Sequence, residues 1–194
     1  MFYKLSERFT EELEKQRVIL SEDREIYRFG IQQGLNLVLN LLTTIAIGLL
    51  CGMLWESVLF MLFYMPLRRY AGGYHAKTHL RCYLYSVLMI TMVLLAIKFL
   101  PLGKFICSCL MLAGGIVIVL FAPIEDANKP LDGVEQRIFR KRTWSILFIE
   151  SCFFIFSLVV QLKMCYGTIS FAIISLASLV MIGKIKNAVQ NEKL

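Results

Sequence analysis

Hydrophobic residues gather in five long stretches of the chain, with charged segments between them. These stretches contain at most one charged residue each and cover residues 29–55, 83–100, 105–124, 143–162 and 164–183. A helix rises about 1.5 Å per residue, so roughly 20 apolar residues cross a hydrocarbon core about 30 Å thick. A chain of 194 residues cannot bury five such helices inside a soluble core. The pattern therefore predicts helices that cross a membrane.

A shorter apolar stretch at residues 54–67 leaves the number of crossings open, because about a dozen residues can also form a re-entrant segment. The distribution of Lys and Arg favours a full crossing. With six spans and a cytoplasmic N-terminus, every base except Lys98, Lys104 and Lys163 lies inside, whereas five spans place nine bases inside and twelve outside. Cytoplasmic loops are enriched in Lys and Arg. We therefore predict an all-α membrane protein of about six transmembrane helices, with both termini in the cytoplasm and spans at about 30–52, 54–67, 83–100, 104–122, 143–162 and 165–183.

The first 28 residues predict an amphipathic helix on the cytoplasmic side. They hold seven acids and six bases, with Leu5, Phe9 and Leu13 at four-residue steps. The segment lacks the apolar core that a secretion signal requires. A helix at the membrane surface and a docking surface for a partner helix both fit this pattern.

Composition narrows the class of protein further. The net charge of +7 follows from bases that face the anionic inner leaflet, so it requires no nucleic-acid partner. The six cysteines are an even number, but most lie in or beside apolar runs, and we expect free thiols. They occupy positions 51, 82, 107, 109, 152 and 165.

Several polar groups fall inside the predicted spans. Gln32, Asn36, Asn40 and Thr44 recur every four residues and form one stripe on the first span. Amides facing lipid are costly, so this stripe should face other helices or a second copy, and the Gly48-x-x-x-Gly52 pattern on the same span is typical of close helix packing. Glu150, inside the fifth span, fits a functional carboxylate and a structural, hydrogen-bonded one equally.

Both histidines and one cysteine lie in the basic loop expected at residues 68–82. A cysteine nucleophile ionises with help from a base, nearby cations or a helix N-terminus. Cys82, at the start of the third span, has cations nearby and His75 as a candidate base. Seven residues of straight helix would separate the two side chains by about 10 Å, so the chain must bend between them. The Gly72-Gly73 pair permits that bend.

Two other interpretations of the loop are open. His75, His79 and Cys82 have the spacing of metal ligands, but the sequence lacks the glutamate of an HExxH motif and Lys77 would repel a cation. We expect no metal and no cofactor. The bases and histidines of the loop could also bind lipid headgroups alone.

The run RRYAGGYHAKTHLRCY, residues 68–83, resembles the signature of the AgrB family, the membrane peptidases of accessory-gene-regulator quorum-sensing systems. A second segment, APIEDANKPL at residues 122–131, resembles the family's loop that ends in Asn-Lys-Pro. The length, the apolar segments and the charged N-terminal helix also match, so the likeness covers nearly the whole chain. The family positions fall on Arg68, Arg69, Gly73, His75 and Cys82.

The resemblance implies a catalytic base, His75, and a nucleophile, Cys82. The substrate would be an AgrD-like precursor with an amphipathic helix, a central cysteine and an acidic tail, processed in the bacterial cell membrane through a thioester to a cyclic thiolactone. A homodimer is also expected. The residues expected to bind the substrate, with Arg68 foremost, are Arg68, Arg69, Gly73, Lys77 and Lys129. For these bases, membrane topology alone is an equal alternative.

Other parts of the catalytic machinery are less defined by the sequence. Backbone amides near Cys82 and Tyr83 are the candidates for an oxyanion hole, and Glu125 and Asp126 are options for orienting His75. A small transporter with a path lined by the polar stripe and Glu150 is the alternative function, and a non-catalytic scaffold is a third. A transporter should tolerate Cys82→Ser, whereas a peptidase should not.

Overall fold

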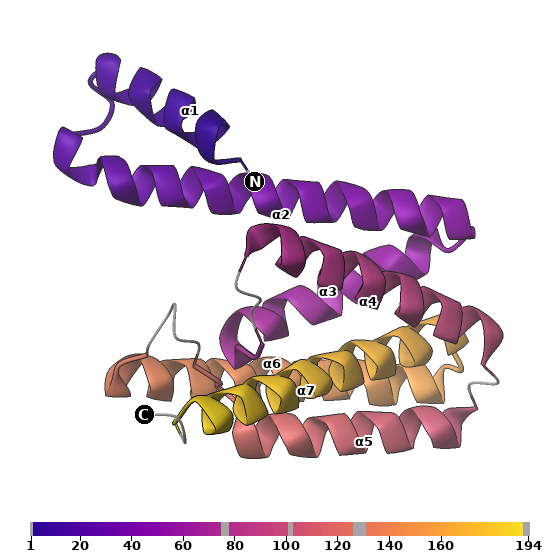
Figure 1. Ribbon diagram of the computed structural model, residues 1–194. Helices are drawn as coiled ribbons and strands as arrows, with labels where there is room; N and C mark the ends of the chain where they lie inside the picture. The colour runs from indigo at the N-terminus through magenta and orange to yellow at the C-terminus, as the bar shows by residue number, and fades with distance from the viewer. Residues whose placement is uncertain (1, 75–77, 101–102, 126–130, 192–194) are drawn as a thin grey trace.

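The computed structural model describes residues 2–74, 78–100, 103–125 and 131–191 (Figure 1). These described residues form helices joined by short connections and contain no strand. The all-α fold predicted from the sequence is confirmed. In chain order the elements are α1 (Tyr3–Lys15), η1 (Ser21–Asp23), α2 (Arg24–Cys51), α3 (Leu54–Ala71), α4 (His79–Phe99), α5 (Lys104–Phe121), α6 (Gly133–Val159) and α7 (Lys163–Asn191).

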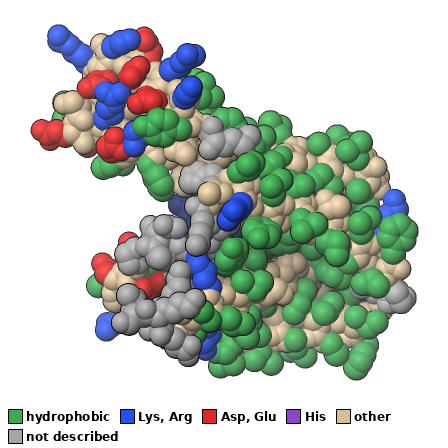
Figure 2. Space-filling view, in the orientation of Figure 1, with side chains coloured by type: hydrophobic (Ala, Val, Ile, Leu, Met, Phe, Trp, Pro, Cys, Tyr) green, Lys and Arg blue, Asp and Glu red, His purple; other side chains and the backbone are tan. Residues whose placement is uncertain are grey.

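Five of the described helices, α2 and α4 to α7, are long and apolar enough to cross a membrane. Helix α3 differs because its 18 residues include Glu56, Arg68 and Arg69. It nevertheless packs inside the bundle against α2, α6 and α7, with Phe60 and Leu67 almost fully buried. The bundle thus agrees with about six membrane helices preceded by an N-terminal helix. Figure 2 shows the broad apolar surface that the bundle presents to its surroundings.

The connections between the bundle helices gather at two opposite ends (Figure 1). One end holds the start of α2, the α3–α4 and α5–α6 connections and the C-terminal end of α7. The other end holds the α2–α3, α4–α5 and α6–α7 connections, together with Lys98, Lys104 and Lys163. At that second end the Lys98 Nζ donates to the carbonyl of Cys51 at 3.0 Å. This alternation is the arrangement expected of six successive crossings.

Helix α7 is the centre of the bundle and packs against α3, α4, α5 and α6. Its approach to α5 is close because the facing residues are small: a methyl group at Gly114 would lie 2.8 Å from Ile173 Cγ2. Ser170 donates from its hydroxyl to the carbonyl of Cys107 at 3.0 Å. Small residues and hydroxyls are typical of helix contacts within membranes. The buried side chains of α7 include Tyr166, Ile169, Ala172, Ile173, Leu176, Ala177 and Val180.

The two glycines of the Gly48-x-x-x-Gly52 pattern both serve the α2–α3 turn within one chain. Gly52 ends α2 in the left-handed conformation, with φ of 67°. Gly48 lies against Ser57 of α3, and a methyl group there would collide with the serine Oγ and lie 2.8 Å from its Cβ. The close packing expected of this pattern is therefore found between α2 and α3.

Replacing Gly48 by Ala should destabilise the α2–α3 pair. The added methyl group overpacks the contact with Ser57, a change that typically costs about 1–3 kcal/mol. Thermal unfolding of the purified protein in detergent measures the effect. Gly34→Ala on the same helix is the matched control, because nothing lies within 4 Å of a methyl group there. Adding Ser57→Gly should restore the lost stability, and a Gly48→Ala protein as stable as wild type would contradict this packing.

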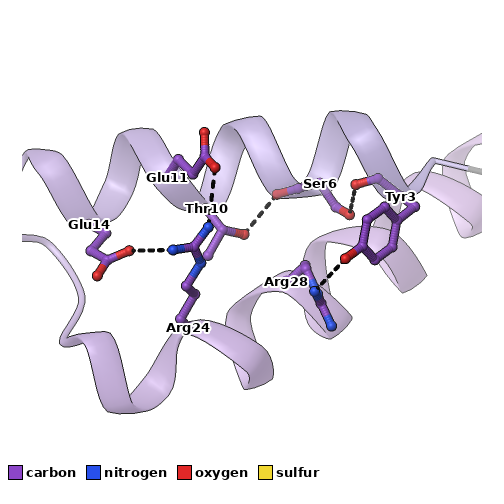
Figure 3. Close-up of polar contacts among 7 residues, drawn as sticks. All are labelled: Tyr3, Ser6, Thr10, Glu11, Glu14, Arg24 and Arg28. Carbon is purple, nitrogen blue, oxygen red and sulfur yellow. Dashed lines mark hydrogen bonds and ion pairs between the residues drawn. The ribbon is translucent and has the colours of Figure 1, made fainter.

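Helix α1 packs on the N-terminal part of α2 through small and polar residues (Figure 3). Ser6 and Thr10 are fully buried, and each hydroxyl is satisfied by a carbonyl three or four residues earlier. Arg24 of α2 forms ion pairs with Glu11 and Glu14 at 3.2 and 3.3 Å. On α1 itself, Leu5 and Phe9 remain exposed. An exposed apolar stripe on a helix with charged flanks fits a position at a membrane surface.

Candidate active site at the end of the bundle

The connection between α3 and α4 is shorter than the loop of residues 68–82 expected from the sequence. Helix α3 continues through Arg68 and Arg69 to Ala71, where cations near a helix C-terminus are favoured. Helix α4 begins at His79 and is capped by Thr78, whose side chain accepts a hydrogen bond from the Arg81 amide at 3.3 Å. Cys82 therefore lies in the first turn of α4. The predicted site residues His75, Lys77 and Lys129, and also Asp126, fall outside the described residues.

Cys82 is half-buried at the N-terminal end of α4. Side chains on a helix tilt toward its N-terminus, so the thiol lies by the positive end of the helix dipole. Tyr64 of α3 lies within electrostatic reach of both Cys82 and Arg68.

The Cys82 amide itself cannot serve as an oxyanion-hole donor, contrary to the expectation from the sequence. It donates to the carbonyl of Thr78 at 3.0 Å, and so belongs to the regular bonding of the helix. The first amides of a helix have no carbonyl partner within it. Those of His79 and Leu80, one turn before Cys82, are therefore the better candidates for a donor pair.

Arg68 holds the chain that leads to His75. One guanidinium nitrogen donates to the carbonyl of Gly72, and the other donates to the carbonyl of Tyr74 at 2.6 Å. The substrate contact that the sequence suggested for this residue stays a prediction, and the structure adds a clamp from the last turn of α3 to the residue before His75. A guanidinium has five N–H donors, so this clamp leaves others for a ligand.

Gly72 and Gly73 make the bend between α3 and α4, as the sequence suggested. Their φ angles are 68° and 112°, a region that favours glycine. Gly72 pairs with Ile124, whose amide donates to the carbonyl of Ala71 at 3.0 Å. A methyl group at Gly72 would collide with the carbonyl oxygen of Ile124. The two segments of the chain that resemble family motifs thus lie side by side.

Tyr74 connects this bend to both α4 and α7. Its amide donates to the carbonyl of Leu179 at 2.9 Å, and its ring meets the ring of Tyr85 edge-on, with centroids 6.0 Å apart. Lys186 lies over the Tyr74 ring at 5.3 Å. Tyr85 is three residues after Cys82 and therefore on the same side of α4. The residue that precedes His75 is thus anchored beside the face of α4 that carries Cys82.

The remaining charged residues of this end join α3, α6 and α7. Arg142 donates to the Tyr70 hydroxyl at 3.1 Å, while the exposed Arg69 lies over the same ring at 5.9 Å. The Glu125 carboxylate accepts a hydrogen bond from the side-chain amide of Gln136 at 3.3 Å, and the Glu125 backbone carbonyl accepts one from the side chain of Asn187 at 2.8 Å. Glu125 therefore lies at the same end of the bundle as Cys82.

Sequence reasoning missed the contribution of α7 to this site. Leu179, Gly183, Lys186 and Asn187 all contact the two loops or lie against them. The one available signal was Gly183, since an isolated glycine in a helical pattern often has a packing reason.

The polar groups of the spans point inward to different degrees. Thr44 is buried and the other three residues of the stripe are half-buried, with Asn40 donating to the Asn36 carbonyl at 3.0 Å. Glu150 is only 3% exposed, and one of its carboxyl oxygens has no hydrogen-bond partner among the described residues.

Comparison with known proteins gives one family. The profile described as "AgrB: Accessory gene regulator B" matches residues 6–182. The chain is 26% identical over 131 residues to accessory gene regulator protein B of Staphylococcus saprophyticus, covering 68% of each chain. It is 32% identical over 136 residues to an AgrB-like protein of Listeria monocytogenes, covering 64% of this chain and 65% of the relative. It is 30% identical over 130 residues to an AgrB-like protein of Halalkalibacterium halodurans, covering 66% of this chain and 64% of the relative. The chain thus spans about two thirds of the length of these relatives. No solved structure matches it.

Proposed function

The chain belongs to the accessory gene regulator B (AgrB) family, and from this premise we propose that it is a membrane cysteine endopeptidase that processes an autoinducer precursor peptide. The observation that best supports the proposal is the position of Cys82. Its thiol lies at the positive end of α4, one turn from the Tyr74–Tyr85 contact that anchors the residue before His75. A thiol beside a helix N-terminus and a potential base has what a cysteine nucleophile requires.

In the proposed reaction, His75 takes the proton of the Cys82 thiol. The thiolate attacks the carbonyl carbon of the peptide bond before the acidic tail of the precursor. The carbon–nitrogen bond then breaks, and the departing amine receives the proton from His75. The product on the enzyme is a thioester between Cys82 and the shortened peptide.

A cysteine within the precursor completes the proposed reaction. Its thiolate attacks the thioester carbonyl, forms a new carbon–sulfur bond and releases the Cys82 thiolate. The peptide leaves as a cyclic thiolactone. Water would hydrolyse the intermediate instead, so the site must exclude it. The packed ends of α3, α4 and α7 and the bound peptide supply that exclusion in this proposal.

The charge distribution supports the direction of substrate approach. The end of the bundle with Cys82 carries the Lys and Arg of α3 and α6, together with Lys184 and Lys186 of α7, while the described bases of the other end are Lys98, Lys104 and Lys163. By the positive-inside rule the Cys82 end and both termini face the cytoplasm. We propose that these bases, with Arg69, Lys77 and Lys129 among them, receive the acidic tail. The homodimer expected from the family stays part of this proposal.

Trapping the intermediate tests the proposed function. The full chain is expressed in membranes with a precursor whose internal cysteine is replaced by serine, so that the second step is slowed. We expect a peptide adduct on the fragment that contains Cys82, detected by mass spectrometry and removed by hydroxylamine, which cleaves thioesters. A transporter would form no adduct. Precursor that disappears without any adduct or cleaved tail would contradict the peptidase.

A further inference from the structure

The C-terminal half of α7 supports the two segments of the chain that flank the proposed site. The carbonyl of Leu179 accepts the Tyr74 amide, and two turns later the Asn187 side chain donates to the Glu125 carbonyl. Between these contacts lies Gly183, buried against both segments. Both loops thus rest on one side of a single helix.

Gly183 has no room for a side chain. A methyl group there would lie 2.9 Å from the amide nitrogen of Tyr74, 3.0 Å from the carbonyl carbon of Gly73 and 3.1 Å from Ile124 Cγ2. Two of these neighbours are backbone atoms, which cannot rotate away as the end of a side chain can. The chain at Gly73 therefore lies directly on the surface of α7.

The same short segment is also held by Arg68. A methyl group at Gly73 would collide with the Arg68 guanidinium and would lie 3.1 Å from the backbone of Leu179. The segment of residues 72–74 is thus in contact with both the Arg68 clamp and α7. It cannot move away from a larger residue at position 183 without breaking the hydrogen bonds of Arg68 or of the Tyr74 amide.

We propose that Gly183 is a positioning residue of the active site: the absence of a side chain lets the Gly73–Tyr74 backbone lie against α7, and this contact fixes the position of Tyr74, the residue before His75. The proposal rests on the proposed function, in which His75 activates Cys82. Gly183 touches neither substrate nor the reacting atoms. It acts through Tyr74, whose carbonyl carbon is bonded to the nitrogen of His75.

The test measures how fast Cys82 reacts with iodoacetamide as a function of pH. The full-length protein in detergent is alkylated, digested, and the fragment with Cys82 is quantified by mass spectrometry, which separates it from the other five cysteines. The wild-type protein, His75→Ala and Gly183→Ala are compared. Because displacement of a catalytic group by about 1 Å can cost roughly 10²-fold, we expect Gly183→Ala to shift the alkylation profile toward higher pH, most of the way to His75→Ala, with a similar loss of precursor processing.

Two other glycines provide matched controls. Gly114→Ala is equally crowded, since a methyl group would lie 2.8 Å from Ile173 Cγ2, but this contact is ten residues of α7 away from Gly183. Gly115→Ala places a methyl group where nothing lies within 4 Å. We expect Gly114→Ala to lower the melting temperature, and both variants to keep the wild-type alkylation profile. A shift of the profile in Gly114→Ala would mean that destabilisation alone moves it, and would overturn the proposal.

If Gly183→Ala folds poorly, the double variant Gly183→Ala with Ile124→Ala relieves the part of the crowding that comes from a side chain. It keeps the two backbone contacts, so it should still show the shifted profile. A return to the wild-type profile would overturn the proposal, because crowding of Ile124 would then be the cause. If His75→Ala changes the profile and Gly183→Ala does not, only this inference fails. If His75→Ala itself leaves the profile unchanged, the proposed dyad fails, and the role of Gly183 fails with it.

Discussion

Replacing Cys82 by Ala or by Ser should abolish processing of the precursor peptide, with a loss on the order of 10³-fold or more, as for other enzymes that lose their nucleophile. A serine hydroxyl is far less acidic than a thiol, so a helix N-terminus and an imidazole that can activate a cysteine would not ionise a serine. The measurement is release of the acidic tail from the precursor by membranes that contain the full chain, followed by mass spectrometry.

Cys165→Ser is the matched control for this experiment. Cys165 is half-buried like Cys82 but lies at the start of α7, at the opposite end of the bundle. Its replacement should leave tail release unchanged, which separates loss of the nucleophile from a general effect of replacing a cysteine. Substantial activity in Cys82→Ser would exclude the thioester route and favour a transporter or scaffold.

The hydrophobic pattern predicted the helices of the bundle because a membrane span must be both long and uncharged. The run at residues 105–124 contains most of α5, and the run at residues 164–183 lies within α7, which continues beyond it to Asn191. The pattern was less informative for α3, which continues through Arg68 and Arg69. Those residues lie in the last helical turn, where the helix dipole favours cations. A prediction from hydropathy alone ends the helix at its first charged residue, whereas the backbone hydrogen bonds of the helix continue past it.

The sequence could predict those features of the site that depend on residues close together in the chain. The glycine bend and the position of Cys82 at a helix start follow from residue types near each other in the chain. The contacts that hold the bend were not predictable in this way. Tyr74 bonds to Leu179 and Gly72 pairs with Ile124, over separations that no local pattern encodes. For the same reason the sequence did not indicate the clamp made by Arg68, since its two carbonyl partners appear only when the bend is formed.

These contacts restrict the movement of the chain segment that precedes the proposed base. A base and a nucleophile on different elements must be held to within a fraction of an ångström for efficient proton transfer. Helix α4 fixes Cys82 through regular hydrogen bonds, while the preceding bend contains two glycines and is intrinsically flexible. Contacts with Arg68 and with α7 remove that freedom at residues 72–74. Rigid support of this kind is what a catalytic loop requires.

Arg68→Lys should reduce precursor processing by roughly 10²-fold, the cost of displacing a catalytic group by about 1 Å, while binding of the precursor stays near its wild-type level. Lysine retains the positive charge but has one nitrogen, so it cannot reach the carbonyls of Gly72 and Tyr74 together as the planar guanidinium does. Tail release measures the rate, and co-purification of the precursor with a Cys82→Ala background measures binding.

Arg69→Lys is the matched control, because Arg69 is the adjacent residue, is exposed and, among the described residues, lies over the Tyr70 ring. It should retain most of the activity. Arg68 could attract the acidic tail or clamp the bend, and the two roles can be distinguished because the first depends on charge and the second on the shape of the side chain. A residue that attracts an acidic tail needs its charge, so Arg68→Lys would remain active and Arg68→Glu would lose binding. A clamp needs the forked shape, so both variants lose the rate and both still bind. Retention of wild-type rate in Arg68→Lys would therefore exclude the clamp as a requirement for catalysis.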